Sequence, residues 1–391
     1  MKNARSAILL VLASPFFCHA QFMDDFESGE ITGWTTLTGD GQATMKLIPQ
    51  DGFVRLEVDG TKDRHNVWWA ITKRDVSGFL DMHKLEDPAF ELRVEVRVRA
   101  SHAPRRANIM INTQRTTNFH KQLREYDLSD TEWHTISMTT QDLDAVNGDE
   151  LNVQIGITDW GLGVYHLDID YYKADIVKVD TNAADLGEPL VYHPPIPNVD
   201  TFSHHLSVTH DALINADFPK VNFHKWTEAE ERVLTISAQQ WAILRWDLDQ
   251  NENARADGAA ILELTTHSIA QGGDYISAYG EDLGIEFDKI RIVEILGGDP
   301  HWDQSSVTFQ TFAQGEALEK LVNGQMIFDT ELAKERGGKT YATIPRPVMQ
   351  RLLDGTTKGL TIRPLGALDA SIYDSEEAGQ RFAPTLYFNT R

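Results

Sequence analysis

Short runs in which apolar and polar residues alternate recur along the first half of the chain, separated by turn residues. The clearest run is Phe90–Ala100, where Leu and Val alternate with Arg and Glu. Successive strand side chains point to opposite faces, so one face of this segment is expected to be buried and the other charged. Other strands are predicted at Phe53–Val58, Val67–Thr72, Ala107–Arg115, Trp133–Thr139, Leu151–Thr158 and Val164–Val179. This spacing predicts a β-sandwich or jelly roll over residues 21–180.

The second half of the chain shows the same kind of pattern over residues 201–391. Strands are predicted at Trp241–Asp247, Ala260–Thr265, Lys289–Ile295, Ser306–Thr311, Lys339–Ile344, Gly359–Pro364 and Thr385–Asn389, and short helices at Glu316–Val322 and Pro347–Leu353. Residues 181–200 contain four prolines, which favour an extended and semi-rigid linker. The predicted fold class is therefore all-β, with two tandem β-sandwich or jelly-roll domains joined by a Pro-rich linker.

The first twenty residues have the pattern of a signal peptide. Lys2 and Arg5 precede an apolar core, and Cys18-His19-Ala20 ends in a small residue before the expected cleavage point. The apolar core is too short to span a bilayer, and no later segment is long and apolar enough. A secreted or periplasmic protein without a membrane partner is expected. Its single cysteine would leave with the signal peptide, and the oligomeric state is left open.

The charge of the chain is uneven. The 391 residues carry a net charge of −23, which argues against nucleic acid as a partner. In contrast, Arg93–Arg124 holds eight basic residues and one acid. Arginine grips carboxylate or sulfate with two parallel hydrogen bonds, so this segment predicts a groove that binds an acidic polysaccharide. The alternative is a solvated sheet face whose arginines pair with nearby acids.

The groove would form if the polar faces of Phe90–Ala100 and Ala107–Arg115 lined the same sheet surface. Trp68 would add an aromatic platform on which a sugar ring stacks, unless it is buried at a domain edge. The predicted substrate-binding residues are Arg93, Arg97, Arg99, Gln114, Lys121, Lys173 and Trp68.

The same segment holds the groups that β-elimination from a uronate requires. The carboxylate must be neutralised while a base removes the proton alpha to it, and an acid must protonate the leaving oxygen. Asn112 and Arg115 are candidates for neutralisation, and His120, Tyr126 and Tyr171 are candidates for proton transfer. The alternatives are a surface loop for the histidine and ordinary packing for the two tyrosines.

Three short motifs follow one another in an order that resembles the family 7 alginate lyases. They are Arg93-Val94-Glu95-Val96-Arg97, Gln154-Ile155-Gly156 and Tyr171-Tyr172-Lys173-Ala174-Asp175. The resemblance implies a jelly-roll groove suited to elimination chemistry. Gly156 stands where that family has its catalytic histidine, and Asp175 replaces a glycine.

A longer set of motifs in the second half resembles the DNRLRE-type β-sandwich of secreted bacterial proteins. The motifs are Leu244-Arg245-Trp246-Asp247, Ile261-Leu262-Glu263-Leu264, Trp302–Phe309, Tyr373-Asp374-Ser375-Glu376 and Ala383-Pro384-Thr385-Leu386. Such domains are similar to carbohydrate-binding modules. The resemblance therefore implies an accessory domain that binds carbohydrate or acts as a spacer.

Three functions are therefore weighed. The leading one is a secreted polysaccharide lyase that cleaves a uronate-containing, sulfated or unsulfated polysaccharide. The alternative is a non-catalytic tandem carbohydrate-binding protein, and a glycoside hydrolase is the third. None requires a cofactor for its chemistry, but Glu27 and Asp170 are candidate oxygen ligands for a structural calcium ion.

Overall fold

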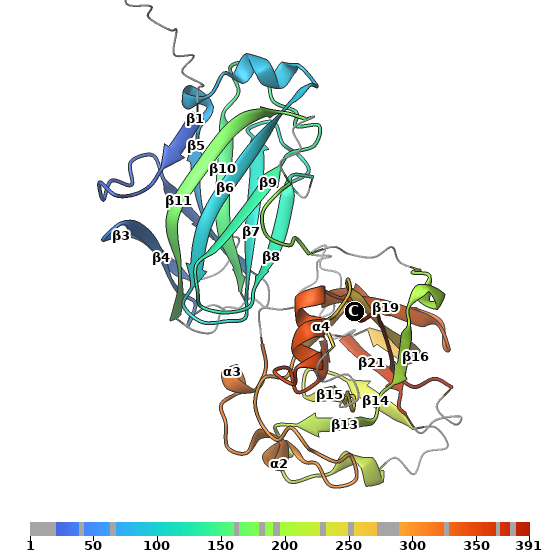
Figure 1. Ribbon diagram of the computed structural model, residues 1–391. Coiled ribbons are helices and arrows are strands. Elements are labelled where there is room, and N and C mark those ends of the chain that lie inside the picture. The colour runs from blue at the N-terminus through green and yellow to red at the C-terminus, as the bar shows by residue number, and fades with distance from the viewer. Residues whose placement is uncertain are drawn as a thin grey trace, which may run out of the picture.

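The computed structural model describes residues 21–391 except 39–42, 63–67, 120, 160–163, 180–183, 191–195, 227–231, 249–253, 272–288, 324–327, 365–367 and 376–380. The described chain is built mainly from β-strands arranged as two sandwiches in sequence order (Figure 1). This confirms the predicted fold class. The expected signal peptide lies outside the described residues, and the domain boundaries stay predictions.

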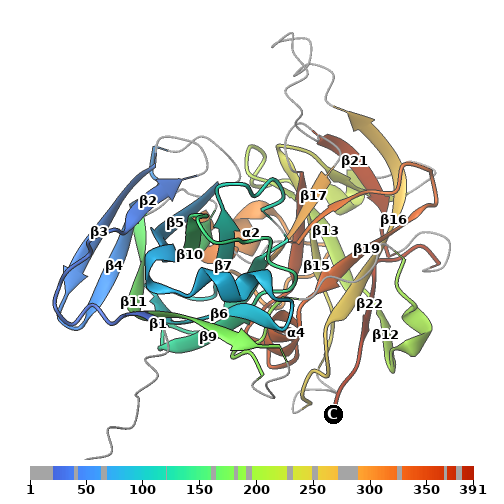
Figure 2. The ribbon, with the colours of Figure 1, turned by 90° about the horizontal axis from the view of Figure 1, so that it is seen from above.

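The N-terminal sandwich consists of two antiparallel sheets, here called sheet A and sheet B, which form separate layers in Figure 2. Sheet A has the order β3 (Thr44–Gln50), β4 (Phe53–Asp59), β11 (Val164–Lys178), β6 (Phe90–Ala100) and β9 (His134–Thr139), with β1 (Gln21–Asp24) also paired to β11. Sheet B has the order β2 (Thr35–Thr38), β5 (Trp68–Asp75), β10 (Leu151–Asp159), β7 (Arg105–Thr113) and β8 (Leu123–Leu128).

The alternation along β6 has the predicted result. Leu92, Val94, Val96 and Val98 are fully buried, and they belong to a core cluster with apolar residues of sheet B. The intervening Arg and Glu side chains therefore lie on the outer face of sheet A. Two short 3-10 turns, η1 (Ser77–Phe79) and η2 (Met82–Glu86), connect β5 to β6.

The C-terminal sandwich also has two sheets, sheet C and sheet D, around its own core cluster. Sheet C has the order β12 (His204–Ser207), β22 (Thr385–Phe388), β16 (Ala260–Gln271), β21 (Leu368–Tyr373) and β14 (Val233–Ile236), with β19 (Lys339–Ile344) also paired to β16. Sheet D has the order β13 (His210–Asn215), β15 (Gln240–Arg245), β20 (Leu360–Pro364), β17 (Lys289–Glu294) and β18 (Phe328–Glu331).

Short helical segments accompany the C-terminal sandwich: η3 (Val199–Thr201), η4 (Phe223–Trp226), α2 (Phe309–Ala313), α3 (Leu318–Leu321) and α4 (Arg346–Leu353). The strand predicted at Ser306–Thr311 is wrong, because α2 begins within it. Thr308 caps this helix: its hydroxyl accepts from the Thr311 amide at 3.1 Å, and the Thr311 hydroxyl accepts from the Thr308 amide at 2.9 Å. This reciprocal capping satisfies amides that a helix start leaves unpaired.

The linker follows the N-terminal sandwich over its described residues 184–190. The Ser137 amide of β9 donates to the Leu186 carbonyl at 3.0 Å, and the Leu190 amide donates to the Glu125 carbonyl of β8 at 2.8 Å. The segment thus connects the adjacent edges of sheets A and B. Gly187 has a φ of +80°, and a Cβ there would lie 2.9 Å from Ile136, so this close approach requires glycine.

A buried ionic cluster joins the two sandwiches. Arg351 of α4 donates to Asp127 of β8 at 2.8 Å and to both oxygens of Glu294 of β17 at 2.8 and 3.0 Å. The side chains of Asp127 and Glu294 are fully buried, so one arginine serves two buried carboxylates. Burial raises the pKa of Asp127 to about 6, although Arg351 opposes that shift. Removing one member of such a cluster leaves uncompensated buried charge.

Two arginines of α4 provide a matched test of this cluster. Arg351→Ala leaves two buried carboxylates without their cation, and we expect a loss of roughly 3–5 kcal/mol in the free energy of unfolding. Arg346 pairs with Glu188, and both side chains are more than one-third exposed, so Arg346→Ala should cost less than about 1 kcal/mol. Chemical denaturation followed by tryptophan fluorescence measures both, and equal losses would contradict the assignment.

Candidate functional site

The outer face of sheet A gathers charged and aromatic side chains from three strands and a turn. It is turned toward the viewer in Figure 1, and no other described element lies over it. We call this surface the arginine face. Its members are Phe53, Arg55, Glu95, Arg97, Arg99, Trp133, Asp168, Asp170, Tyr171 and Lys173.

The carboxylate of Asp168 is the centre of the arginine face. It is fully buried and accepts two hydrogen bonds from Arg55 of β4, at 2.7 and 3.1 Å. It also accepts two from Arg99 of β6, at 3.2 and 2.8 Å. Because both guanidinium groups bind the same carboxylate in paired geometry, their positions are fixed across three neighbouring strands.

A β-bulge adds a second ion pair beside the first. The register between β11 and β6 shifts between Ile169 and Tyr171, which leaves Asp170 as the extra residue. Asp170 accepts from Arg97 at 2.6 Å, and Tyr171 lies opposite Arg97 in the ladder. The bulge therefore brings two consecutive polar side chains to the outer face, as bulges at functional sites often do.

Two aromatic rings pack against the guanidinium groups. The rings of Phe53 and Trp133 lie 5.8 Å apart at 76°, an edge-to-face arrangement. The Cζ atoms of Arg97 and Arg99 lie 5.3 and 4.5 Å from the Trp133 ring centroid. These contacts combine cation–π attraction with a half-buried apolar surface next to hydrogen-bonding groups.

Several donors on this face have no carboxylate partner among the described residues. Arg97 uses Nη1 for Asp170, and Arg99 uses Nε and Nη2 for Asp168, which leaves one terminal nitrogen of each uncommitted. The side-chain ammonium of Lys173 makes no hydrogen bond or ion pair with another described residue. The face can thus donate hydrogen bonds to a further acceptor while its framework stays paired.

Burial shifts the pKa values of two titratable groups on and beside the face, Tyr171 and His166. Burial and a 2.8 Å hydrogen bond to Glu95 raise the pKa of Tyr171, which disfavours its phenolate. Burial lowers the pKa of neighbouring His166, with Asp168 opposing and Arg55 and Arg99 assisting, so this imidazole is neutral.

The predicted groove between β6 and β7 does not form. These strands belong to sheets A and B, so their outer faces lie on opposite sides of the sandwich. The expected single polar surface is therefore wrong. Local alternation shows that each strand has a polar face, but it does not show which sheet the strand joins.

The predicted residues of the Asn112–Lys121 segment make structural hydrogen bonds and ion pairs beside sheet B. Arg115 binds Asp149 and Asp144, and Gln114 donates to Asp149 at 2.9 Å. The Lys121 ammonium donates to the Asp142 carbonyl at 3.0 Å, and Asn112 accepts from Gln154.

The remaining predicted residues are distributed elsewhere. Tyr126 lies in the core, where its hydroxyl donates to the Ser137 carbonyl at 2.6 Å and burial raises its pKa. Arg93 holds the linker through the Ala184 carbonyl at 2.8 Å. His120 lies outside the described residues, as does the side chain of Trp68. Of the five catalytic candidates, only Tyr171 is placed on the arginine face.

The three lyase-like motifs also divide between sheets. Gln154–Gly156 lies in β10 of sheet B, whereas the other two motifs lie in β6 and β11 of sheet A. A Cβ at Gly156 would approach Ile71 to 2.3 Å and the Ala70 carbonyl to 2.8 Å. This crowding excludes a histidine at that position.

A calcium site stays a prediction. Asp170 is committed to Arg97, and Glu27 lies exposed in the loop after β1. Among the described residues, no group of three or more His, Cys, Asp or Glu side chains is placed to hold a metal ion.

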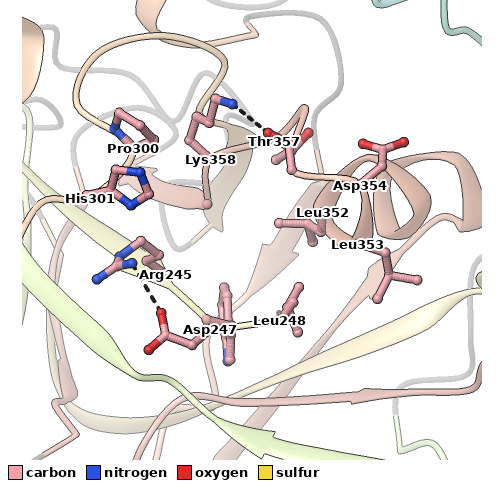
Figure 3. Close-up of a pocket in the computed structure, with 13 residues that line it drawn as sticks. Arg245, Asp247, Leu248, Pro300, His301, Leu352, Leu353, Asp354, Thr357 and Lys358 are labelled. Carbon is pink, nitrogen blue, oxygen red and sulfur yellow. Dashed lines mark hydrogen bonds and ion pairs between the residues drawn. The ribbon is translucent and has the colours of Figure 1, made fainter. Parts of the chain in front are cut away.

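The C-terminal sandwich contains a cavity of about 320 Å³ beside α4 (Figure 3). Arg245 donates to Asp247 at 3.1 Å, and Lys358 donates to the Gly355 carbonyl at 2.6 Å. His301 and Asp354 also line it, together with leucine side chains. Its charges are largely satisfied within the cavity wall, so we regard it as secondary to the arginine face.

The solved structures that resemble this chain include carbohydrate-binding modules. A family 11 module from Clostridium thermocellum, in complex with a mixed-linked tetrasaccharide, is 16% identical, covers 40% of this chain and 95% of its own, and has a TM-score of 0.27. The CBM22-2 xylan-binding domain from Paenibacillus barcinonensis is 14% identical over 40% of this chain and 99% of its own, with a TM-score of 0.28. Similarities this low carry no argument about function. No family model and no curated protein matches the sequence.

Among the helices in the described ranges, none is both long and apolar enough to cross a membrane.

The sequence interpretation missed Phe53, Arg55 and Trp133 as members of the site. Phe53–Val58 was predicted as a strand, and its alternation of Arg55 and Glu57 with apolar residues could have indicated a charged outer face. The pairing of Arg55 with Asp168 spans 113 positions and has no local signal.

Asp168 and Asp170 allow the buried and the surface ion pair to be compared. Asp168→Asn keeps the side-chain shape but removes the charge that two arginines share, so we expect roughly 2–3 kcal/mol of lost stability. Asp170→Asn alters a pair that is partly exposed and should cost less than about 1 kcal/mol. Thermal and urea unfolding of the two variants give the comparison, and a larger effect at Asp170 would refute the central role of Asp168.

Proposed function

We propose that this protein binds a polysaccharide on the arginine face without cleaving it. The observation that carries the proposal is the array of Arg55, Arg97 and Arg99 fixed on an open sheet face beside Phe53 and Trp133. Ordered donors and acceptors suit sugar hydroxyls, and the aromatic surface suits the apolar faces of sugar rings. Because the framework is held by Asp168 and Asp170, little side-chain entropy is lost when a ligand binds.

The more specific part of this proposal is that the bound polysaccharide is acidic. The uncommitted nitrogens of Arg97 and Arg99 and the ammonium of Lys173 are suited to donate hydrogen bonds to a carboxylate or sulfate. The paired acids reduce the net positive charge that the sequence suggested. We therefore infer recognition of carboxylates at individual positions rather than capture by a broad cationic field.

Binding without cleavage is favoured over elimination for a geometric reason. Elimination needs a base and carboxylate-neutralising groups around one reacting carbon. Among the described candidates, Tyr171 lies on sheet A, Asn112 and Arg115 are committed at sheet B, and Tyr126 is in the core. Hydrolysis by a carboxylate pair is likewise disfavoured on this face, because Asp168 and Asp170 are each bound to arginine.

Affinity electrophoresis in gels that contain alginate or xylan tests the proposal. We expect retardation by alginate, and Arg97→Ala and Lys173→Ala should each weaken it by about tenfold, the effect of losing a hydrogen bond to a charged group. The exposed Arg255 contacts Arg391 through its backbone and provides the matched control Arg255→Ala. The ultraviolet absorbance of unsaturated uronate should stay flat during incubation with alginate.

The outcomes separate the parts of the proposal. Retardation by xylan alone would keep polysaccharide binding and refute the acidic ligand. No retardation by either polymer would contradict the proposed function. A rise in absorbance that Tyr171→Phe abolishes would instead establish elimination.

A further inference from the structure

A cavity of about 470 Å³ lies where the two sandwiches meet. Its wall comes from three parts of the chain: β8, β9 and the turn between them, the linker, and α4 with the loop that follows it. Its polar lining includes Asp127, Ser129, Thr135, Glu188, Arg351 and Asp354. Its volume is in the range of ligand sites, which often lie between domains. We call it the interdomain cleft.

The cleft begins where the arginine face ends. Thr135 of β9 lines the cleft and lies opposite Arg97 of β6 in the ladder. Arg97 in turn lies opposite Tyr171 of β11. These three residues form one row across sheet A, so a chain lying along that row reaches the cleft after crossing a single edge strand.

The chemistry of the cleft suits a polyhydroxylated ligand. Ser129, Asp354 and Thr356 are exposed and offer hydroxyl and carboxylate groups, and the Arg346–Glu188 pair forms part of the rim. Leu128, Ile136 and Pro347 add apolar surface for the C–H groups of a sugar ring. Positive and negative groups occur together, which favours hydroxyl groups over a strongly charged ligand.

Asp127 and Arg351, which line the cleft, each carry one buried polar atom without a partner among the described residues. Asp127 Oδ1 and Arg351 Nη1 are buried, and neither has a hydrogen-bond partner among the described residues. Buried polar groups normally find a partner in protein, ligand or ordered water. A hydroxyl group or an ordered water can donate to the carboxylate or accept from the guanidinium, so either can supply a missing partner.

The walls of the cleft are held in place. The buried contacts of Arg351 fix α4 against β8, and the Arg346–Glu188 pair fixes the linker to the same helix. Because these contacts cross the domain boundary, the cleft is formed before any ligand arrives. A preformed site loses less ordering entropy on binding.

We propose that the interdomain cleft is a second saccharide subsite, so that one polysaccharide chain contacts the arginine face and α4 at the same time. This inference rests on the proposed function and extends it to the second sandwich. Asp354 lines both the interdomain cleft and the cavity of Figure 3, so the bound polysaccharide can extend from the cleft into the C-terminal sandwich.

Isothermal titration of the full chain with short and long oligosaccharides tests the subsite. Alginate oligomers serve as the acidic probe and xylo-oligosaccharides as the neutral probe. Ser129→Trp fills the cleft from an exposed position, and Asp354→Ala removes an exposed carboxylate that accepts from the Thr356 amide at 3.1 Å. Each should weaken binding of long oligomers by about tenfold, while trisaccharides, which the arginine face alone can hold, should bind as to wild type.

Asp257→Ala is the matched control, because Asp257 is exposed and lines neither cavity. Thermal unfolding confirms that each variant folds. Unchanged affinity of both cleft variants for long oligomers would overturn the subsite and leave the proposed function standing, with the cleft holding only water. Failure of the wild type to bind either probe at any length would overturn both proposals.

Discussion

The buried carboxylate of Asp168 is the interaction on which the arrangement of the candidate site depends. A charge removed from water is tolerated only when it is paired and hydrogen-bonded, and Asp168 meets this condition through Arg55 and Arg99. The same bonds extend from β4 across β11 to β6, which are distant in sequence and adjacent in sheet A. The outer face thereby becomes an ordered surface whose exposed nitrogens have defined positions.

The ionic cluster of Arg351 performs a comparable role between the two sandwiches. It places a helix of the C-terminal domain next to β8 at the edge of sheet B, and the linker bonds to the same strand through the Leu190 amide. The Pro-rich segment therefore contributes to the domain junction over its described residues 184–190. A face on one domain and a cleft between both domains become neighbours through these contacts.

Some elements of the fold could be predicted from the sequence and others could not, for identifiable physical reasons. The strict alternation of β6 predicted both its buried and its charged face, because period-two patterning depends only on neighbouring residues. Strand β8 was missed because it offers only Tyr126 and Leu128 as buried positions among charged neighbours. The helix at Phe309–Ala313 was mistaken for a strand because Val307, Thr308 and Thr311 are β-branched, whereas the side chains of Thr308 and Thr311 cap a helix.

The candidate site was predicted in part for the same physical reason. Arg97, Arg99, Tyr171 and Lys173 were identified, and the structure brings them to one face. Their partners were not identified, since ion pairs between distant strands follow from sheet order. Sheet order also separated Asn112 and Arg115 from this face, although they are close to β6 in sequence.

The most direct test of the central claim is arginine footprinting with phenylglyoxal, read by mass spectrometry with and without an alginate oligosaccharide. Arg97 is 42% exposed in its side chain and is expected to react in the free protein. The account predicts that the glycan protects Arg97 and Arg99 while exposed Arg255 stays reactive. Equal reactivity of Arg97 in the presence of bound glycan, with protection elsewhere, would contradict the arginine face as the binding site.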